Sequence, residues 1–224
     1  MNKKQKTIFK IILIFIVFGV FIWFIYKDKY EYFTTDEFTY IHKELLEILD
    51  KLLPIFNNHG INYWANHGTL LGCVRESKII DKDDDIDLAL FKDDFLYLQN
   101  NKNNIVGDLN NNGLHFIKLG EEFSLNKIVK LKKDGDYTKN KIFIDLMAFD
   151  KINGIYKHIN DSWPEDNFKE EELLPFKKGM FNHIEINIPN NPIENLKRNY
   201  GDNWKTPDNK DPHHKLEINL NIKK

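Results

Sequence analysis

The sequence predicts an α+β fold of the α/β type, in which helices flank a mixed sheet that follows an N-terminal transmembrane helix. Three features support this prediction. Apolar residues recur at helical period through residues 38–56, which indicates one long amphipathic helix. Residues 85–90 alternate polar and apolar side chains, as a half-buried strand does, and residues 142–147 form a second, almost wholly apolar strand. Residues 11–26 are an unbroken apolar and aromatic run.

The N-terminal run predicts a membrane anchor. Its length is close to the ~20 residues that a spanning helix needs, and Trp23, Phe24 and Tyr26 at its end are aromatics suited to a membrane interface. A cleaved signal peptide is the alternative, but its apolar region is shorter and ends in small residues. Lysines are more frequent before the run than after it, which favours a cytoplasmic N-terminus. We therefore expect a single-pass membrane protein with a tail and anchor at 1–29 and one lumenal or extracytoplasmic domain at 30–224.

The composition narrows the classes of partner. Among 224 residues, 32 are Lys or Arg and 34 are Asp or Glu, so the formal net charge is −2. This charge gives no general attraction to nucleic acid, and no basic and aromatic patch supplies one. The single cysteine, Cys73, excludes an internal disulfide framework and lies in an apolar run, so we expect it to pack in the core.

A run of aspartates is the first candidate site. Five of the seven positions 81–87 are Asp, and such carboxylates repel one another unless a cation or a proton relieves them. Asp85 and Asp87 alternate with apolar residues on the predicted strand, so they share one face. Two carboxylates on one strand face can chelate a hard cation. We therefore expect Mg²⁺ or Mn²⁺ at Asp85 and Asp87, with Asp83 as a further ligand.

A glycine turn precedes the aspartates. His67-Gly68-Thr69 joins a predicted strand at 62–65 to a predicted helix at 70–75. Gly68 allows the backbone to approach a ligand closely, and Thr69 opens a helix whose first N–H groups attract phosphate. A phosphate-binding turn followed by a metal-binding strand is typical of phosphoryl or nucleotidyl transfer.

These motifs resemble a known family. HGTLLGCVR at 67–75 followed by DDDID at 83–87 is similar to the LicD/fukutin-type family of the nucleotidyltransferase (polymerase-β-like) superfamily. The resemblance implies a nucleotidyltransferase-like sheet and a phosphotransferase. Such an enzyme moves a phospho-alcohol or phospho-sugar from a nucleotide-activated donor, such as a CDP-alcohol, onto a glycan or polyol acceptor. It also implies that His67, Gly68, Thr69 and Arg75 bind the donor, and that Arg75 neutralises charge as the nucleoside monophosphate leaves.

Asp145 is the candidate for a third carboxylate. It stands alone among apolar residues in the predicted strand at 141–150, where a charge is costly unless it is paired or binds metal. The resemblance implies a third metal ligand on a later strand beside the first two, and Asp145 matches that position. It, or a residue on the acceptor side, would take the acceptor's proton. A structural aspartate near a strand end is the alternative, and Asp150 is the poorer candidate because it follows the apolar run.

Aspartate runs also occur in proteins of different classes. A solvated loop does not account for the alternation that follows this run. An EF-hand loop is excluded, because its sixth position would be Ile86 instead of Gly and its twelfth Lys92 instead of Glu. A D-x-D glycosyltransferase, a nucleotidyltransferase that transfers the nucleoside monophosphate itself, and an inactive glycan-binding relative all remain open. A labelled CDP-alcohol would separate them.

The remaining segments give predictions of single elements. They are a helix from Asp93, a flexible polar connection at 100–112, paired strands at 114–119 and 125–131, strands at 154–159, 174–176 and 181–189, and a helix at 192–199 that stops at Gly201. Four lysines, Lys127, Lys130, Lys132 and Lys133, face either donor phosphates or solvent. Tyr200, Trp204 and the pair His213-His214 either form an acceptor or base pocket or pack structurally.

Overall fold

The computed structural model describes residues 35–100, 104–118, 126–130, 142–159 and 163–207. The expected anchor at 11–26, part of the connection at 100–112, Lys132, Lys133 and His213-His214 lie outside these residues. Within the described ranges, no helix is both long enough and apolar enough to cross a membrane. The chain divides into two compact units, Met1–Thr39 and Tyr40–Lys224. Every contact discussed below lies within the second unit.

The long amphipathic helix is present as α2, Thr35–Asn58. Its buried side chains recur three and four residues apart, which makes one apolar stripe. These are Leu45, Ile48, Leu49, Leu52 and Phe56. On another side of the helix, Glu44 and Glu47 bind the Lys130 ammonium at 3.2 and 2.7 Å, which ties α2 to a strand of the sheet.

The strands form a mixed sheet, as predicted. They are β1 Tyr63–Ala65, β2 Ile86–Phe91, β3 Leu114–Lys118, β4 Asn126–Lys130, β5 Phe143–Ile152, β6 Ile155–His158 and β7 Asn167–Lys169. The order is β1-β2-β5-β4-β3, and β6 pairs with both β5 and β7. Only the β2–β5 pair is parallel among the strand pairs described for this sheet. Its register sets Asp87 directly opposite Asp145.

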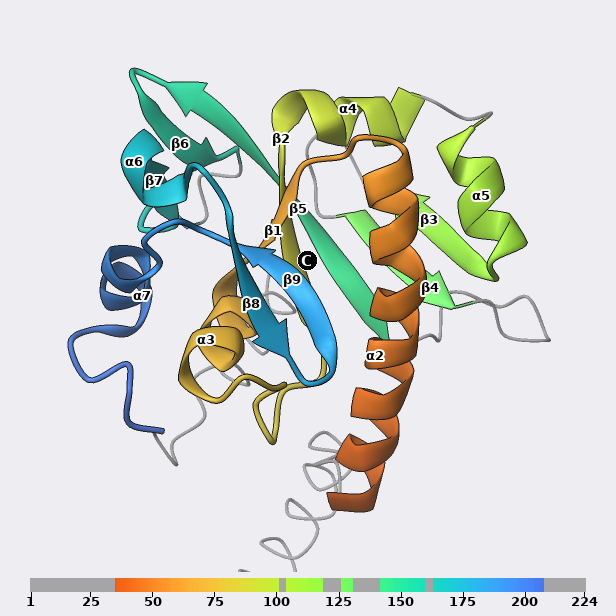
Figure 1. The fold of residues 1–224 in the computed structure, drawn as a ribbon, viewed down its shortest axis with the longest axis horizontal. Helices are drawn as coiled ribbons and strands as arrows, with labels where there is room; N and C mark the ends of the chain where they lie inside the picture. Colours follow the sequence, from red (N-terminus) through yellow and green to blue (C-terminus); the bar gives the residue numbers. More distant parts are fainter. Residues whose placement is uncertain (1–34, 101–103, 119–125, 131–141, 160–162, 208–224) are drawn as a thin grey trace, which may run out of the picture. The chain divides into compact units, whose positions relative to one another are not determined.

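Short helices flank the sheet (Figure 1). They are α3 His67–Arg75, α4 Lys92–Asn100, α5 Ile105–Asn111, α6 Glu170–Leu173 and α7 Ile193–Tyr200. Helix α3 contacts β1, β2 and α7, α4 contacts β2 and β5, and α5 contacts β3. The last helix stops at Gly201, whose positive φ of 77° is a backbone conformation that favours glycine.

The structure corrects two of the segment predictions and extends a third. The connection at 100–112 contains a helix, α5, in which Ile105 and Leu109 are buried. Residues 174–176 are not a strand. The predicted strand at 181–189 is present as β9 Ile184–Ile188, and it forms a hairpin with β8 Lys177–Phe181, which was not predicted, separate from the main sheet. Asn182 has φ 56° in the turn, which interrupts the apolar alternation.

An aromatic core lies around Trp64, which is 0% exposed. Its ring has centroid distances of 5.2 to 6.1 Å to four phenylalanines from distant parts of the chain. These are Phe91, Phe149, Phe168 and Phe176. Large aromatic side chains bury much apolar area, so this packing holds β1, β2 and β5 together behind the candidate site.

Candidate active site

Three carboxylates meet where β2 and β5 begin. Asp87 and Asp145 are opposite each other in the parallel register, and Asp85 directly precedes β2. One carboxylate oxygen from each of the three lies within 4.8 Å of the others. Asp87 and Asp145 are each only 7% exposed. We call Asp85, Asp87 and Asp145 the carboxylate triad.

Burial and mutual repulsion make the triad electrostatically unfavourable by itself. Burial first, and then Asp83 and Asp145, raise the pKa of Asp85 well above its ordinary value. Burial and then Asp85 and Asp145 do the same to the pKa of Asp87. A divalent cation between the carboxylates would stabilise their charged forms. Carboxylate oxygens are also the ligands that Mg²⁺ and Mn²⁺ prefer, so the residues present fit such an ion.

Asp83 connects the triad to a second acidic group. Asp83, Asp84 and Asp85 form another set of three whose oxygens lie within 4.8 Å of one another, and all three are half-buried. The imidazole Nε2 of His42 lies 2.8 Å from the Asp83 carbonyl oxygen, so α2 holds the backbone at this point. Asp81 instead pairs with Lys78 and is exposed, so it lies outside both sets.

The start of α3 is bonded directly to the strand that bears Asp87. The Asn66 N–H donates to the Asp87 carbonyl oxygen at 3.1 Å, and the Asp87 N–H donates to the Thr69 hydroxyl at 2.8 Å. The helix begins at His67, three residues earlier than the predicted helix at 70–75. Thr69 therefore lies within the first turn and does not open the helix. Its hydroxyl accepts the hydrogen bond from the strand.

Gly68 allows Asp83 to approach α3. A Cβ atom at Gly68 would stand 2.6 Å from Asp83 Oδ2, so any side chain there would displace this carboxylate. The first N–H groups of a helix carry partial positive charge and favour an anion. In this structure the Asp83 carboxylate lies beside Gly68 in the first turn. This is the place where the sequence predicted a bound phosphate.

Gly72 allows the loop that leads from α3 to the aspartates to pass close over the same helix. A Cβ at Gly72 would meet the Lys78 carbonyl oxygen at 2.5 Å. The spacing of the two glycines on α3 therefore places both the loop and its aspartates against the helix.

Arg75 lies at the opposite end of α3 from His67. It lies at the last position of the nine-residue helix α3, whose first residue is His67. Its Nε donates to Glu76 Oε1 at 2.8 Å. None of the contacts described for Arg75 is with the triad, so its predicted role towards the donor stays a proposal.

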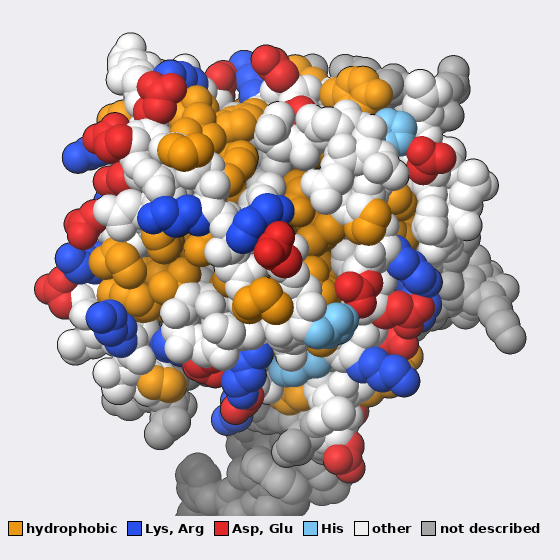
Figure 2. Space-filling view, viewed as in Figure 1, with side chains coloured by type: hydrophobic (Ala, Val, Ile, Leu, Met, Phe, Trp, Pro, Cys, Tyr) orange, Lys and Arg blue, Asp and Glu red, His pale blue; other side chains and the backbone are white. Residues whose placement is uncertain are grey.

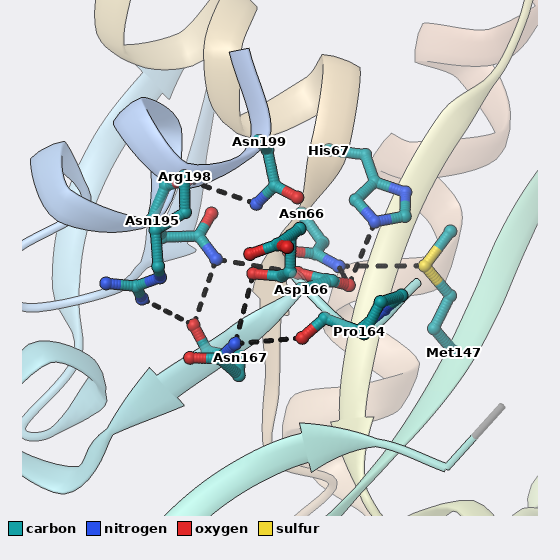
Figure 3. A network of polar contacts seen from close by, with 10 residues as sticks. Asn66, His67, Met147, Pro164, Asp166, Asn167, Asn195, Arg198 and Asn199 are labelled. Carbon is teal, nitrogen blue, oxygen red and sulfur yellow. Dashed lines mark hydrogen bonds and ion pairs between the residues drawn. The ribbon is translucent and has the colours of Figure 1, made fainter. Parts of the chain in front are cut away.

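His67 belongs to a buried polar network that the sequence did not predict (Figure 3). Asp166 is 1% exposed, and its carboxylate accepts from Asn66 Nδ2 at 2.9 Å and from Asn195 Nδ2 at 3.5 Å. His67 Nε2 lies 2.9 Å from Asp166 Oδ2. On the α7 side, Asn195 and Arg198 also donate to the Asn167 carbonyl oxygen, at 3.2 and 2.6 Å.

The hydrogen bonds and charges of this network shift the pKa values of Asp166 and His67 in the direction opposite to that of burial. Burial alone would raise the pKa of Asp166, but His67 and Asn66 lower it below its ordinary value. Burial would lower the pKa of His67, but Asp166 and, to a smaller extent, Asp145 raise it. Both pKa shifts favour the charged forms, so Asp166 and His67 are suited to form an ion pair beside the triad. The sequence gave no signal for this pair. Asp166 lies next to the exposed Glu165 in one short loop, and nothing in the sequence distinguishes the buried carboxylate from the exposed one.

Tyr200 of α7 lies near the same carboxylates. Burial, followed by Asp87 and Asp83, raises its pKa well above its ordinary value. Of the other aromatic candidates, Trp204 is 6% exposed, which agrees with structural packing. Tyr200 is thus an acceptor-side candidate within the electrostatic reach of the triad.

The lysines of β4 face different surroundings. Lys127 Nζ lies 3.3 Å from Asp145 Oδ1, whereas Lys130 binds Glu44 and Glu47 of α2. Lys127 thus faces the triad, whereas Lys130 faces α2.

Comparison with known proteins agrees with the motifs. The family described as LicD/FKTN/FKRP, nucleotidyltransferase domain, matches residues 60–191. An uncharacterized protein of Rickettsia prowazekii is 30% identical over 205 residues, which cover 87% of this chain and 71% of the relative. One of Rickettsia typhi is 32% identical over 157 residues, which cover 70% of this chain and 45% of the relative.

A more distant relative has a named activity. The ribitol-5-phosphate transferase FKTN of Homo sapiens is 26% identical over 174 residues, which cover 74% of this chain and 33% of FKTN. This chain therefore spans less than half the length of FKTN and of the Rickettsia typhi relative.

Two solved structures are similar at low sequence identity. One is ANT(2")-Ia in complex with adenylyl-2"-tobramycin, with a TM-score of 0.45, 10% identity and coverage of 76% of this chain and 82% of that one. The other is the lincosamide antibiotic adenylyltransferase LnuA, with a TM-score of 0.41, 17% identity and coverage of 68% and 82%. The family match covers more than half of the chain and agrees with the resemblance seen at 67–75 and 83–87. The chain belongs to the LicD/FKTN/FKRP family, nucleotidyltransferase domain.

Proposed function

We propose that this chain is a metal-dependent phosphotransferase. It moves a phospho-alcohol or phospho-sugar from a nucleotide-activated donor of the CDP-alcohol type onto a glycan or polyol. The observation that carries the proposal is the parallel pairing of β2 with β5, which sets Asp87 opposite Asp145 with Asp85 within ligand distance. The name of the relative FKTN, ribitol-5-phosphate transferase, supports the choice of donor class.

The triad is the proposed metal site. Asp85, Asp87 and Asp145 hold one or two Mg²⁺ or Mn²⁺ ions, and Asp83 is a further ligand. The metal supplies positive charge to the donor's phosphate oxygens when it is bound. As a ligand, Asp83 would turn towards the triad and leave the first turn of α3. The N–H groups of that turn would then be available to a donor phosphate.

The reaction forms one phosphorus–oxygen bond and breaks another. The acceptor hydroxyl attacks the phosphorus that bears the alcohol, and the bond from this phosphorus to the bridging oxygen of the diphosphate breaks. The nucleoside monophosphate leaves with that oxygen, and the product is a phosphodiester. Asp145 or an acceptor-side residue takes the hydroxyl proton, and Tyr200 is an acceptor-side residue near the triad. Arg75 is proposed to neutralise the leaving nucleotide.

The membrane location of the protein and the class of its acceptor are also proposals. Residues 11–26 act as a membrane anchor with the N-terminus in the cytoplasm, and the apolar run itself supports this. Nucleic acid is not the acceptor. Basic and acidic side chains are interspersed on the face of the described residues drawn in Figure 2, which suits no polyanion in particular.

A double-label assay tests the proposed reaction. The protein is incubated with Mg²⁺, a panel of glycan and polyol acceptors, and CDP-ribitol labelled either in ribitol or in cytidine. Phosphotransfer places the ribitol label on the acceptor and releases labelled CMP. Transfer of the cytidine label would instead show nucleotidyl transfer, which differs only in attack at the other phosphorus. Transfer of neither label across a panel of CDP-alcohols would contradict both, and the Asp87→Asn variant provides the inactive control.

A further inference from the structure

We infer that Lys127 is the site's internal cation, which compensates Asp145 before metal binds and then contacts the donor phosphate. The inference deepens the proposed function and rests on it for the donor step. Lys127 lies on β4 directly opposite Asp145 in the antiparallel register. Its Nζ is 3.3 Å from Asp145 Oδ1, and both side chains are largely buried.

The position of the ammonium is defined on two sides. Besides Asp145, Nζ lies 3.0 Å from the centroid of the Phe143 ring. A cation over an aromatic face is attracted by the ring, and more so where water is partly excluded. Phe143 and Asp145 are two residues apart on β5, so they share the face of the sheet that Lys127 also occupies. This arrangement is therefore more restricted than an exposed lysine–carboxylate pair.

The neighbouring lysine shows that this placement is selective. Lys130, three positions along β4, binds Glu44 and Glu47 on α2. Residues three apart on a strand point to opposite faces. One strand thus sends one lysine to the triad and the other to a structural helix. Lys130 is therefore a matched control for Lys127.

The lysine and a metal ion compete for the same carboxylate. An ion bound by Asp85, Asp87 and Asp145 would share Asp145 with the ammonium, and two cations a few ångströms apart repel each other. Metal binding therefore favours movement of Nζ away from Asp145, which the flexible four-carbon stem permits. The proposed donor brings a diphosphate to the same place. The displaced ammonium would then bind a phosphate oxygen.

This exchange predicts opposite effects of one substitution on two ligands. In Lys127→Met, removal of the competing charge should tighten Mn²⁺ binding in the absence of donor by about three- to tenfold. The same substitution should weaken CDP-ribitol binding at saturating Mn²⁺, and lower kcat/KM, by about tenfold or more. A lysine with only a structural role would not move the two affinities in opposite directions.

Calorimetric titration of the full chain tests the inference, first with Mn²⁺ alone and then with CDP-ribitol at saturating Mn²⁺. Lys127→Arg keeps the positive charge and should stay close to the wild type in the first titration. Lys130→Met should change neither affinity. If the methionine variant does not fold, Lys127→Gln provides the same comparison, because it keeps a polar head group and removes the charge.

The outcomes separate this inference from the proposed function. Unchanged or weaker Mn²⁺ binding in folded Lys127→Met or Lys127→Gln overturns the inference, even if the wild type transfers phospho-ribitol. Unchanged donor affinity in these variants overturns the donor contact. Tighter Mn²⁺ binding in a protein that transfers no phospho-alcohol would support the internal cation and count against the proposed function.

Discussion

Two regions of the unit Tyr40–Lys224 bury aspartates, and their surroundings shift the pKa values of these aspartates in opposite directions. Asp166 is surrounded by donors, and its pKa is lowered despite burial because His67 and Asn66 stabilise the charge. In the triad, Asp85 and Asp87 are surrounded mainly by other carboxylates, and their pKa values are raised by burial and repulsion together. Similar burial thus has opposite electrostatic results.

The difference indicates what each region is suited for. The Asp166 network is satisfied by the chain's own side chains, so it can hold α7 against the start of α3 in the absence of any ligand. In the triad, the Lys127 ammonium lies near Asp145, and protons or a cation from outside would stabilise the three carboxylates further. Substitutions should therefore change stability in opposite directions in the two regions.

The largest expected effect is that of Asp87→Asn on transfer. Loss of one charged ligand should lower the rate by about 10³-fold or more, because the metal stabilises charge in the transition state. Without metal, unfolding by urea should show equal or greater stability than the wild type, since the substitution removes repulsion.

Asp81→Asn is the matched control within the same aspartate run. Asp81 pairs with Lys78 and is exposed, so its transfer rate should stay within about twofold of the wild type. Near-normal transfer by Asp87→Asn would contradict the proposed site. So would an Asp87→Asn protein that is inactive because it has unfolded.

The second expected effect is on stability in the other region. Asp166→Ala should lower the free energy of unfolding by about 3 kcal/mol, because it leaves buried donors and the His67 charge without their partner. Glu165→Ala, at an exposed neighbouring position, should change it by less than about 0.5 kcal/mol. Urea unfolding with EDTA present measures both. Equal losses in the two variants would show that the network does not stabilise the fold.

The fold was predictable where a periodic pattern is long. Helix α2 and strand β2 carry sustained apolar periods, β5 carries a nearly continuous apolar run, and all three are present. Helix α5 was missed because it has seven residues and only Ile105 and Leu109 are buried within an Asn-rich segment. The β8–β9 hairpin was missed because its turn depends on the backbone conformation at Asn182, which apolar alternation does not reveal.

The site was predictable where its residues are local or chemically conspicuous. Asp85 and Asp87 share a strand face, and Asp145 is conspicuous as the one charge in an apolar run. Asp166 was not predictable, because its importance depends on Asn66 and His67, about 100 residues earlier. Arg75 was assigned by family resemblance alone, and the described contacts pair it with its neighbour Glu76.

A third prediction distinguishes two aspartates of β5. Mg²⁺ at about 100 times its dissociation constant should stabilise the wild type by about 2.7 kcal/mol, because it binds only the folded state. Asp145→Ala should lose this stabilisation. Asp150→Ala should keep it, because Asp150 pairs with Lys92 at 2.6 Å away from the triad. Thermal unfolding with and without Mg²⁺ measures the shifts. The reverse pattern would mean that the third ligand is Asp150.

The smallest expected effect is the pH dependence of the buried ion pair, measured against His67→Gln. The folded-state pKa of His67 is raised above the ordinary 6.5 by Asp166. Its contribution to stability is therefore fully present below about pH 6.5 and is lost as the pH rises through the folded-state pKa. The pKa of Asp166 is lowered, so its own contribution is lost only in acid, below the ordinary 3.8.

The stability advantage of the wild type over His67→Gln should thus be larger at pH 5.5 than at pH 8.5. Urea unfolding in EDTA at the two pH values measures it. The backbone at position 67 has φ 40°, but the resulting strain does not depend on pH and cancels when the two values are compared. The triad also titrates, but it does so in both proteins, so most of its effect cancels as well. Parallel pH profiles would show that His67 is neutral in the folded protein, and a larger advantage at pH 8.5 would show that burial outweighs Asp166.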